Sequence, residues 1–172
     1  LDWGPEGAIF TVEREAFQKD SLKLFGYAYT APELRPLREI FAHAKTVHCF
    51  RLNAAGVKAS NAFAEARYPG TRGNALRLVV EASEDSTEEA PLFDVYTYLD
   101  TTQVDAQTGV SGASELQDND YICWKKDATL ALAARTPLTG GENGAVQDAA
   151  YQTYLDRVEV YSFNAMGCPS KD

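Results

Sequence analysis

The chain has 172 residues, of which 45% are hydrophobic and 24% are charged, and its formal charge at pH 7 is −9. This composition is typical of a globular protein rather than a disordered one, and the length suffices for one large domain or two small ones. The acidity argues against a general nucleic-acid surface, because phosphate binding requires clustered lysine and arginine. No run approaches the roughly 20 apolar residues of a membrane span, so we expect neither nucleic acid nor membrane as a partner.

The cysteines indicate the compartment in which the protein is made, and the chain ends indicate a fragment. Cys49, Cys123 and Cys168 stand in three separate segments, with no C-x-x-C pair and no histidine at zinc-ligand spacing. They are therefore expected to be packed, reduced thiols of a soluble protein made in a reducing compartment. The chain starts at Leu1 and ends just after an apolar, strand-like run, 158–166, which indicates a fragment of a longer protein.

The first 52 residues alternate between strand and helix patterns. Residues 8–13 alternate as a strand, 13–20 favour a helix, and 46–52 have high β propensity. Thr30-Ala31-Pro32-Glu33 has the form of a capping box with proline in the first turn. The helix that follows has an apolar face made of Leu34, Leu37, Ile40, Phe41 and Ala44. This face predicts packing on a core, and strand, helix, strand is the opening of an α/β domain.

The stretch from residue 61 to residue 82 is typical of strand, turn and strand. Period-two alternation over 61–67 and 76–81 indicates two strands, each with one buried face. The segment between them contains Gly70 and Gly73, which tolerate the positive φ of a compact reversal. We therefore predict two antiparallel strands joined by this turn.

The middle of the chain is predicted to be all β. From residue 53 to about residue 133 no helical period of useful length appears. Further short strands are expected over 92–99, 103–106, 121–124 and 129–133, and the acidic segment 83–90 is expected to be an exposed loop. Regular short strands with polar joints favour a sandwich or a small barrel.

Helical character returns after Arg135. A loop over 136–144 precedes a helix for which Asp148 is the expected cap, and the apolar run 160–166 is expected to form a last strand. The helix has an apolar face made of Tyr151, Tyr154, Leu155 and Val158.

Together these patterns predict a mixed α+β or α/β fold with two domains. Residues 1–52 and 133–172 are expected to form an incomplete α/β core domain from both chain ends. Residues 53–132 are expected to form an inserted antiparallel β-sandwich or small β-barrel.

The residues that carry chemistry elsewhere form no recognisable site here. His43 and His48 belong to no triad or H-E-x-x-H pattern, and Gly140–Gly144 lacks the lysine of a phosphate-binding loop. Acidic clusters without EF-hand spacing occur at Glu84-Asp85, Glu88-Glu89, Asp118 and Asp120. A glycosidase pair among Glu115, Asp118 and Asp120 stays open. We name no catalytic, cofactor-binding or metal residues, and we expect no enzyme and no cofactor.

Several motifs in a fixed order resemble one family. They are W-G-P at 3–5, R-L-N at 51–53, Y-P-G-x-R-G-N at 68–74, P-L-T-G-G-x-x-G at 137–144, Y-Q-x-x-L-D at 151–156 and F-N at 163–164. Together they resemble the tail sheath proteins of contractile bacteriophages and of related prophage or tailocin particles.

The resemblance implies a structural subunit. Subunits of that family stack as six-fold rings around a tail tube, and the sheath shortens to drive the tube through the bacterial envelope. The implied partners are other sheath subunits, the tail tube protein and the baseplate, in a virion tail assembled in the host cytoplasm. The chain departs from the family by lacking both terminal arms and the C-terminal domain, so this fragment is expected to be monomeric.

The alternative is a carbohydrate-binding β-sandwich carried on a larger protein. Tyr96, Tyr98, Tyr121 and Trp124 fall in predicted strands, where outward-facing rings provide a stacking platform. An enzyme of unidentified type is the third interpretation.

Overall fold

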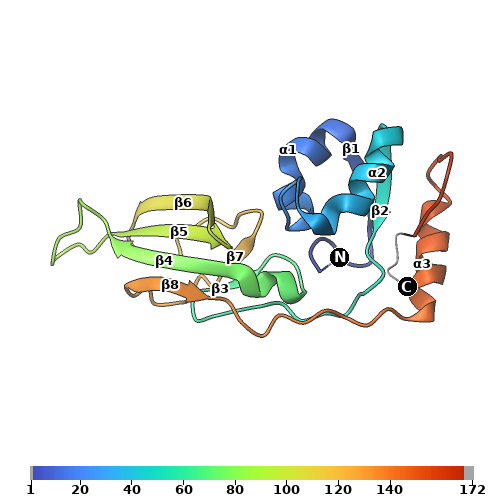
Figure 1. Cartoon of the computed structure of the whole chain (residues 1–172). Coiled ribbons are helices and arrows are strands. Elements are labelled where there is room, and N and C mark those ends of the chain that lie inside the picture. Colours follow the sequence, from blue (N-terminus) through green and yellow to red (C-terminus); the bar gives the residue numbers. More distant parts are fainter. Residues whose placement is uncertain (1, 169–172) are drawn as a thin grey trace. The chain divides into compact units, whose positions relative to one another are not determined.

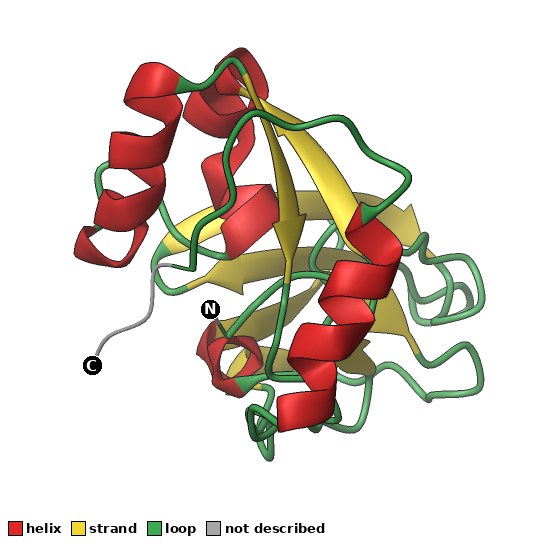
Figure 2. Ribbon diagram, turned by 90° about the vertical axis from the view of Figure 1, so that its right-hand side faces the viewer, coloured by secondary structure: helices red, strands yellow, loops and turns green. Residues whose placement is uncertain are grey.

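A computed structural model describes residues 2–168 (Figure 1). Its contacts divide the chain into two units. Unit 1 contains residues 3–54 and the segment that begins at Ala145, and unit 2 contains Asp2 and residues 55–144. The three α-helices of the described residues belong to unit 1, whereas most of the strands belong to unit 2 (Figure 1). Figure 2 shows the helices in red and the strands in yellow.

Unit 1 combines an antiparallel strand pair with helices. Its elements are β1 (Ile9–Glu13), α1 (Arg14–Phe25), the 3-10 helix η1 (Pro32–Leu34), α2 (Arg35–His43), β2 (Thr46–Phe50) and α3 (Asp148–Val158). β1 and β2 pair with Ile9 opposite Phe50 and Glu13 opposite Thr46. The predicted mixture of helices and strands is confirmed, and the strand pair is antiparallel.

The core of unit 1 is centred on Phe17 of α1. The Phe17 ring is fully buried, stacks on Phe41 at 4.5 Å between centroids, and meets Phe25 edge-on at 5.7 Å. The remaining buried members of this cluster are Val12, Leu34 and Leu37. The apolar face predicted for α2 therefore supplies the core, through Leu37 and Phe41.

Two sequence motifs of unit 1 meet around Arg51. The Arg51 side chain, in a residue only 5% exposed, donates to the backbone oxygen of Gly4 at 3.1 Å and to Oδ1 of Asn53 at 3.1 Å. Glu6 lies 3.7 Å from the same guanidinium. A buried charge is tolerated only when it is paired and hydrogen-bonded, so Gly4 of W-G-P and Asn53 of R-L-N both help to hold the Arg51 side chain.

The expected capping box does not form. Ala31 precedes η1 with no side-chain cap, and α2 begins only at Arg35. The late start of α2 follows from Pro36, which has no N–H to donate to the backbone oxygen of Pro32 four residues earlier. The Arg38 guanidinium instead donates to the backbone oxygen of Ala31 at 2.8 Å.

The end of unit 1 departs most from the sequence prediction. Asp148 lies within the first turn of α3 and does not cap it, since the cap position is Gln147 and carries no side-chain bond. The predicted strand over 160–166 is wrong, because these residues have no strand conformation. A strand requires a hydrogen-bonded neighbour, and no described strand pairs with this segment. Its Val160 is 84% exposed.

Unit 2 contains two antiparallel sheets. Its elements are β3 (Ala64–Ala66), the 3-10 helix η2 (Thr71–Ala75), β4 (Leu76–Ala82), β5 (Phe93–Leu99), β6 (Thr102–Val110), β7 (Ile122–Trp124) and β8 (Ala133–Pro137). Four strands form one sheet in the order β6-β5-β4-β8, and β3 pairs with β7 in the other (Figure 1). The predicted antiparallel β-sandwich class is confirmed.

The predicted pairing around the central turn is wrong. β3 pairs with β7, and β4 pairs with β5 and β8, so the two strands that flank the turn belong to different sheets. The connection contains η2 instead of a tight reversal, and only Gly70 has a positive φ, of 131°. Gly73 is needed for space, since a Cβ there would lie 2.9 Å from Cβ of Ala59.

The last strand of unit 2 begins later than predicted. The expected strand 129–133 is loop up to residue 132, and β8 occupies Ala133–Pro137. β8 pairs with β4, so this segment, which the sequence analysis assigned to the core domain, contributes to the four-stranded sheet. The position of the domain boundary stays a prediction.

Candidate functional site

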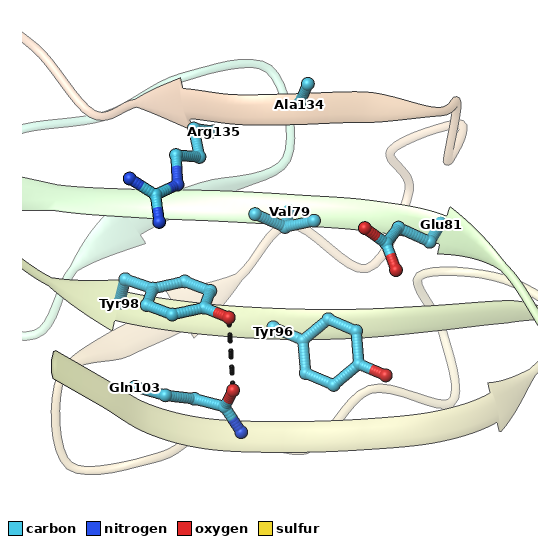
Figure 3. Close-up of a pocket in the computed structure, with 7 residues that line it drawn as sticks. All are labelled: Val79, Glu81, Tyr96, Tyr98, Gln103, Ala134 and Arg135. Atoms are coloured by element: carbon cyan, nitrogen blue, oxygen red, sulfur yellow. Dashed lines mark hydrogen bonds between the residues drawn. The ribbon is translucent and has the colours of Figure 1, made fainter. Parts of the chain in front are cut away.

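The outer face of the four-stranded sheet carries an open groove of about 610 Å³ (Figure 3). Its lining comes from all four strands and consists of Val79, Glu81, Tyr96, Tyr98, Gln103, Ala134 and Arg135. β5 creates this face by alternation: its inward residues, Val95, Thr97 and Leu99, are at most 1% exposed. The side chains between them therefore point away from the core.

Tyr98 contacts two other side chains of the groove, Gln103 and Arg135. Its hydroxyl donates to Oε1 of Gln103 at 3.1 Å, and the Arg135 guanidinium lies 5.7 Å from its ring centroid, within cation–π range (Figure 3). Desolvation and then the negative charges of Asp94 and Glu81 raise the pKa of the neighbouring Tyr96. Tyr96 therefore stays a neutral hydrogen-bonding phenol at physiological pH.

Only part of the expected aromatic platform exists. Tyr96 and Tyr98 line the groove, whereas Tyr121 and Trp124 are 8% and 6% exposed and belong to the core. The Trp124 indole N–H donates to the backbone oxygen of Gln117 at 3.0 Å, which satisfies its polar atom. Sequence reasoning missed Arg135, because the bulge that aims it at Tyr98 leaves no signal in the residue pattern.

The two glycine-containing motifs of unit 2 contact each other directly. The Asn74 side chain donates to the backbone oxygen of Gly141 at 2.9 Å and accepts from the Gly141 N–H at 2.8 Å. A Cβ on Gly141 would lie 2.5 Å from the backbone oxygen of Gly70, so the approach requires glycine. We call these contacts the Asn74–Gly141 clasp.

A second pair extends the clasp. Asn143 Oδ1 accepts from the Thr71 N–H at 3.2 Å, and the Asn143 amide donates to Thr71 Oγ1 at 3.2 Å. The loop 140–144 therefore contacts the turn at 68–74 through Gly141 and Asn143.

Two of the three acidic residues that the sequence left open as a glycosidase pair bind the local backbone. Glu115 Oε2 accepts from the Ser111 N–H at 2.8 Å, and Asp118 Oδ1 accepts from the Trp124 N–H at 2.8 Å. The segment 84–89 is an exposed loop. Across residues 2–168 no three His, Cys, Asp or Glu side chains are placed to hold a metal ion.

The histidines lie in unit 1 and do not meet. His43 is exposed at the end of α2, and His48 Nδ1 lies 2.8 Å from Thr11 Oγ1 across the β1–β2 pair. The His48 ring also contacts Tyr161 at 4.5 Å between centroids.

In the part of the chain described, no helix has the length and apolar character needed to traverse a bilayer.

Glu115 gives a pH-dependent prediction. The Ser111 N–H, and then the Ser111 side chain, hold the pKa of Glu115 below its ordinary value. We expect an NMR titration of the Glu115 carboxyl carbon to give a lower pKa in the folded chain than in urea. Because the folded pKa is the lower one, the stabilisation is present above the unfolded pKa and is lost as pH falls through the folded pKa.

Ser111→Ala is the control for this titration. The variant keeps the backbone donor, so part of the pKa depression is expected to persist. Equal pKa values in the folded and urea-unfolded chain would contradict the assignment.

Cysteine labelling provides a second prediction. Burial raises the pKa of Cys49 to about 12, whereas Cys168 is exposed. At pH 8 only roughly one Cys49 thiol in ten thousand is then ionised, and the thiolate is the reactive form. We expect iodoacetamide to alkylate Cys168 much faster than Cys49, as followed by peptide mass spectrometry.

In guanidinium chloride the same two peptides are expected to label at similar rates. Comparable labelling in the folded chain at pH 8 would show that Cys49 is not desolvated.

Comparison with known proteins gives consistent matches along the chain. The family model described as "Phage tail sheath protein beta-sandwich domain" matches residues 53–143, and "Tail sheath protein Gp18 domain III N-terminal region" matches residues 1–52. The XkdK protein of the Bacillus subtilis phage-like element PBSX is 32% identical over 174 residues, which cover 88% of this chain and 36% of XkdK.

Solved structures agree with these matches. The sheath tail protein of Desulfitobacterium hafniense has 35% identity and a TM-score of 0.84, covering 100% of this chain and 40% of that one. The sheath tail protein Lin1278 of Listeria innocua has 29% identity and a TM-score of 0.77, covering 95% and 37%. This chain thus spans well under half the length of these relatives.

Fold and comparisons define an antiparallel β-sandwich unit combined with a mixed α+β unit, the architecture of the matched sheath structures. The chain belongs to the phage tail sheath protein family. The resemblance seen in its motifs is confirmed.

Proposed function

We propose that this chain is part of a subunit that polymerises into a contractile tail sheath. In this proposal the subunits form six-fold rings around a tail tube, and shortening of the sheath drives the tube through the bacterial envelope. The role is structural and not enzymatic. The observation that carries the proposal is the family match over residues 1–143.

The surface of unit 1 supports assembly. Tyr151 and Leu155 of α3 are each 45% exposed, and Val160, Phe163 and Met166 are 46% to 84% exposed. Exposed apolar side chains that gather on one segment are typical of contact surfaces for other chains or chain segments. Further sheath subunits are the first proposed partner, and the tail tube and baseplate are the others.

We also propose that the two units of this chain are different domains of the sheath subunit. Unit 1 is part of the core domain, and unit 2 is the inserted sandwich, a division supported by the family-model boundary at residue 53. Contraction of this kind rearranges rigid bodies at their interfaces, so the energy resides in contacts between subunits rather than in bond chemistry. The proposed location is the virion tail, after assembly in the host cytoplasm.

Electron microscopy tests the proposal. The full reading frame that encodes this chain is expressed alone beside residues 1–172, and both are examined by negative staining and light scattering. We expect striated tubes or rings from the full frame and a monomer from residues 1–172. A full frame that stays monomeric across salt concentrations would contradict the sheath assignment.

A further inference from the structure

The groove on the outer face of unit 2 has an arrangement that the sheath role does not require. Tyr96 and Tyr98 lie on the same side of β5, and alternate residues of a strand are about 6.8 Å apart. Their rings therefore lie in sequence along the strand (Figure 3). A continuous aromatic surface of this kind offers two neighbouring stacking positions.

β-bulges on the two edge strands of the sheet, β6 and β8, bring polar side chains to these rings. On β8, Thr136 is opposite Leu78 and Ala133 is opposite Val80, so Ala134 and Arg135 together oppose a single residue of β4. On β6, the pairing of Tyr98 with Gln103 also follows a register shift. Bulges re-aim side chains and are over-represented beside functional sites.

Arg135 has an unusual backbone for its position. Its φ is 49°, in the left-handed region that is costly for a side chain of this size. Such conformations persist when the surrounding structure imposes them, and they cluster at binding sites. Here the conformation accompanies the placement of the guanidinium over the Tyr98 ring (Figure 3).

Three polar groups of the groove have hydrogen-bonding capacity that the described protein does not use. Among residues 2–168, the Arg135 guanidinium, the Glu81 carboxylate and the Tyr96 hydroxyl make no hydrogen bond or ion pair with another side chain or with the backbone. All three groups border the tyrosine surface (Figure 3). Arg135 can donate hydrogen bonds, Glu81 can accept them, and the Tyr96 hydroxyl can do both. A ligand that carries hydroxyl groups needs partners of these kinds.

The charges around the groove select against an anionic ligand. The lining carries one acidic and one basic side chain, Glu81 and Arg135, which balance each other, and the negative charges of Asp94 and Glu84 also act on Tyr96. An aromatic face is itself negative and attracts polarised C–H groups. A sugar ring presents C–H groups on its face and hydroxyls at its edge, which matches both properties.

We propose that this groove binds a neutral oligosaccharide, with successive sugar rings stacked on Tyr96 and Tyr98 and their hydroxyls bonded to Glu81, Gln103 and Arg135. The site is independent of sheath assembly, and its test needs no polymer.

Titration of the full chain, residues 1–172, with defined sugars tests the proposal. The probes are maltohexaose, cellohexaose and the hexamer of N-acetylglucosamine, with the hexamer of galacturonic acid as the anionic comparison. Amide resonances of β4, β5 and β8 are followed by NMR. We expect at least one neutral hexamer to give saturable shifts with a Kd of about 1 mM or below, and the anionic hexamer to bind more weakly.

Variants localise the site. Tyr96→Ala is expected to raise Kd about tenfold, because an aromatic anchor typically carries much of the binding free energy. Tyr96→Phe keeps the ring and is expected to retain stacking. Glu81→Ala, at an exposed position, gives an independent variant if Tyr96→Ala does not fold. Tyr151→Ala, in an exposed tyrosine of α3, is the matched control and is expected to leave Kd unchanged.

Three results would overturn the proposal. The first is the absence of shifts with all three neutral hexamers at about 10 mM. The second is binding that neither Tyr96→Ala nor Glu81→Ala weakens. The third is a change in self-association on Tyr96→Ala without sugar binding, which would make this face a protein contact instead.

Discussion

Phe17→Ala is expected to lower the free energy of unfolding of unit 1 by about 3–5 kcal/mol, the usual cost of removing a fully buried phenylalanine. The Phe17 ring contacts Phe41 at 4.5 Å, Phe25 at 5.7 Å and Tyr29 at 5.3 Å between centroids. Removal of the ring leaves a cavity whose walls come from α1 and α2 together. The ring contact that joins α1 to α2 would then be lost.

The two tryptophans of the chain allow this change to be measured in unit 1 alone. Trp3 is buried in unit 1, and Trp124 is buried in unit 2. In a Trp124→Phe background, urea unfolding followed by fluorescence reports the Trp3 environment. Phe163→Ala, which truncates a phenylalanine that is 48% exposed, is the matched control and is expected to change stability by less than about 0.5 kcal/mol.

A loss below about 1 kcal/mol for Phe17→Ala would be well under the usual cost of truncating a buried phenylalanine. It would show that unit 1 is not packed around this ring.

Gly141→Ala is expected to destabilise unit 2 by about 2–4 kcal/mol, from overpacking and the loss of the hydrogen bonds to Asn74. The added Cβ would lie 2.5 Å from the backbone oxygen of Gly70 and 3.0 Å from Cβ of Ala59. Neither atom lies at the end of a flexible side chain, so the loop has to move. Movement of the loop breaks the Asn74–Gly141 clasp.

Gly112→Ala provides the control within the same unit, since a Cβ there meets no atom within 4 Å. Fluorescence of Trp124 in a Trp3→Phe background follows both variants through urea unfolding. We expect Gly112→Ala to stay within about 0.5 kcal/mol of its parent. Equal midpoints for the two alanine variants would show that the close approach at Gly141 does not hold unit 2 together.

The sequence predicted the elements of this fold better than their partners. Period-two alternation identified the buried side of β4, where Leu76, Leu78 and Val80 are at most 2% exposed. Alternation carries no information on which strand lies alongside, and β3 was therefore paired wrongly. The apolar run at 160–166 shows the same limit, because high β propensity does not supply a hydrogen-bonding neighbour.

The contacts between the motifs could not be predicted from the sequence either. Gly73 and Gly141 are glycines because another backbone or β-carbon passes close to them, and this close approach depends on tertiary structure. Likewise, the sequence suggested Tyr96 and Tyr98 as a stacking surface. It could not reveal that Tyr121 is core or that a bulge directs Arg135 onto the same face.

The Asn74–Gly141 clasp joins residues 67 positions apart, and this separation has a consequence for biosynthesis. At the usual speed of translation those 67 residues take roughly 3–13 s to emerge. During most of that time β8 has not been made, so one hydrogen-bonding edge of β4 has no strand to pair with. Nascent chains paused before residue 133 therefore present this unpaired edge to chaperones and to aggregation, whereas chains that have passed residue 141 can close both the sheet and the clasp.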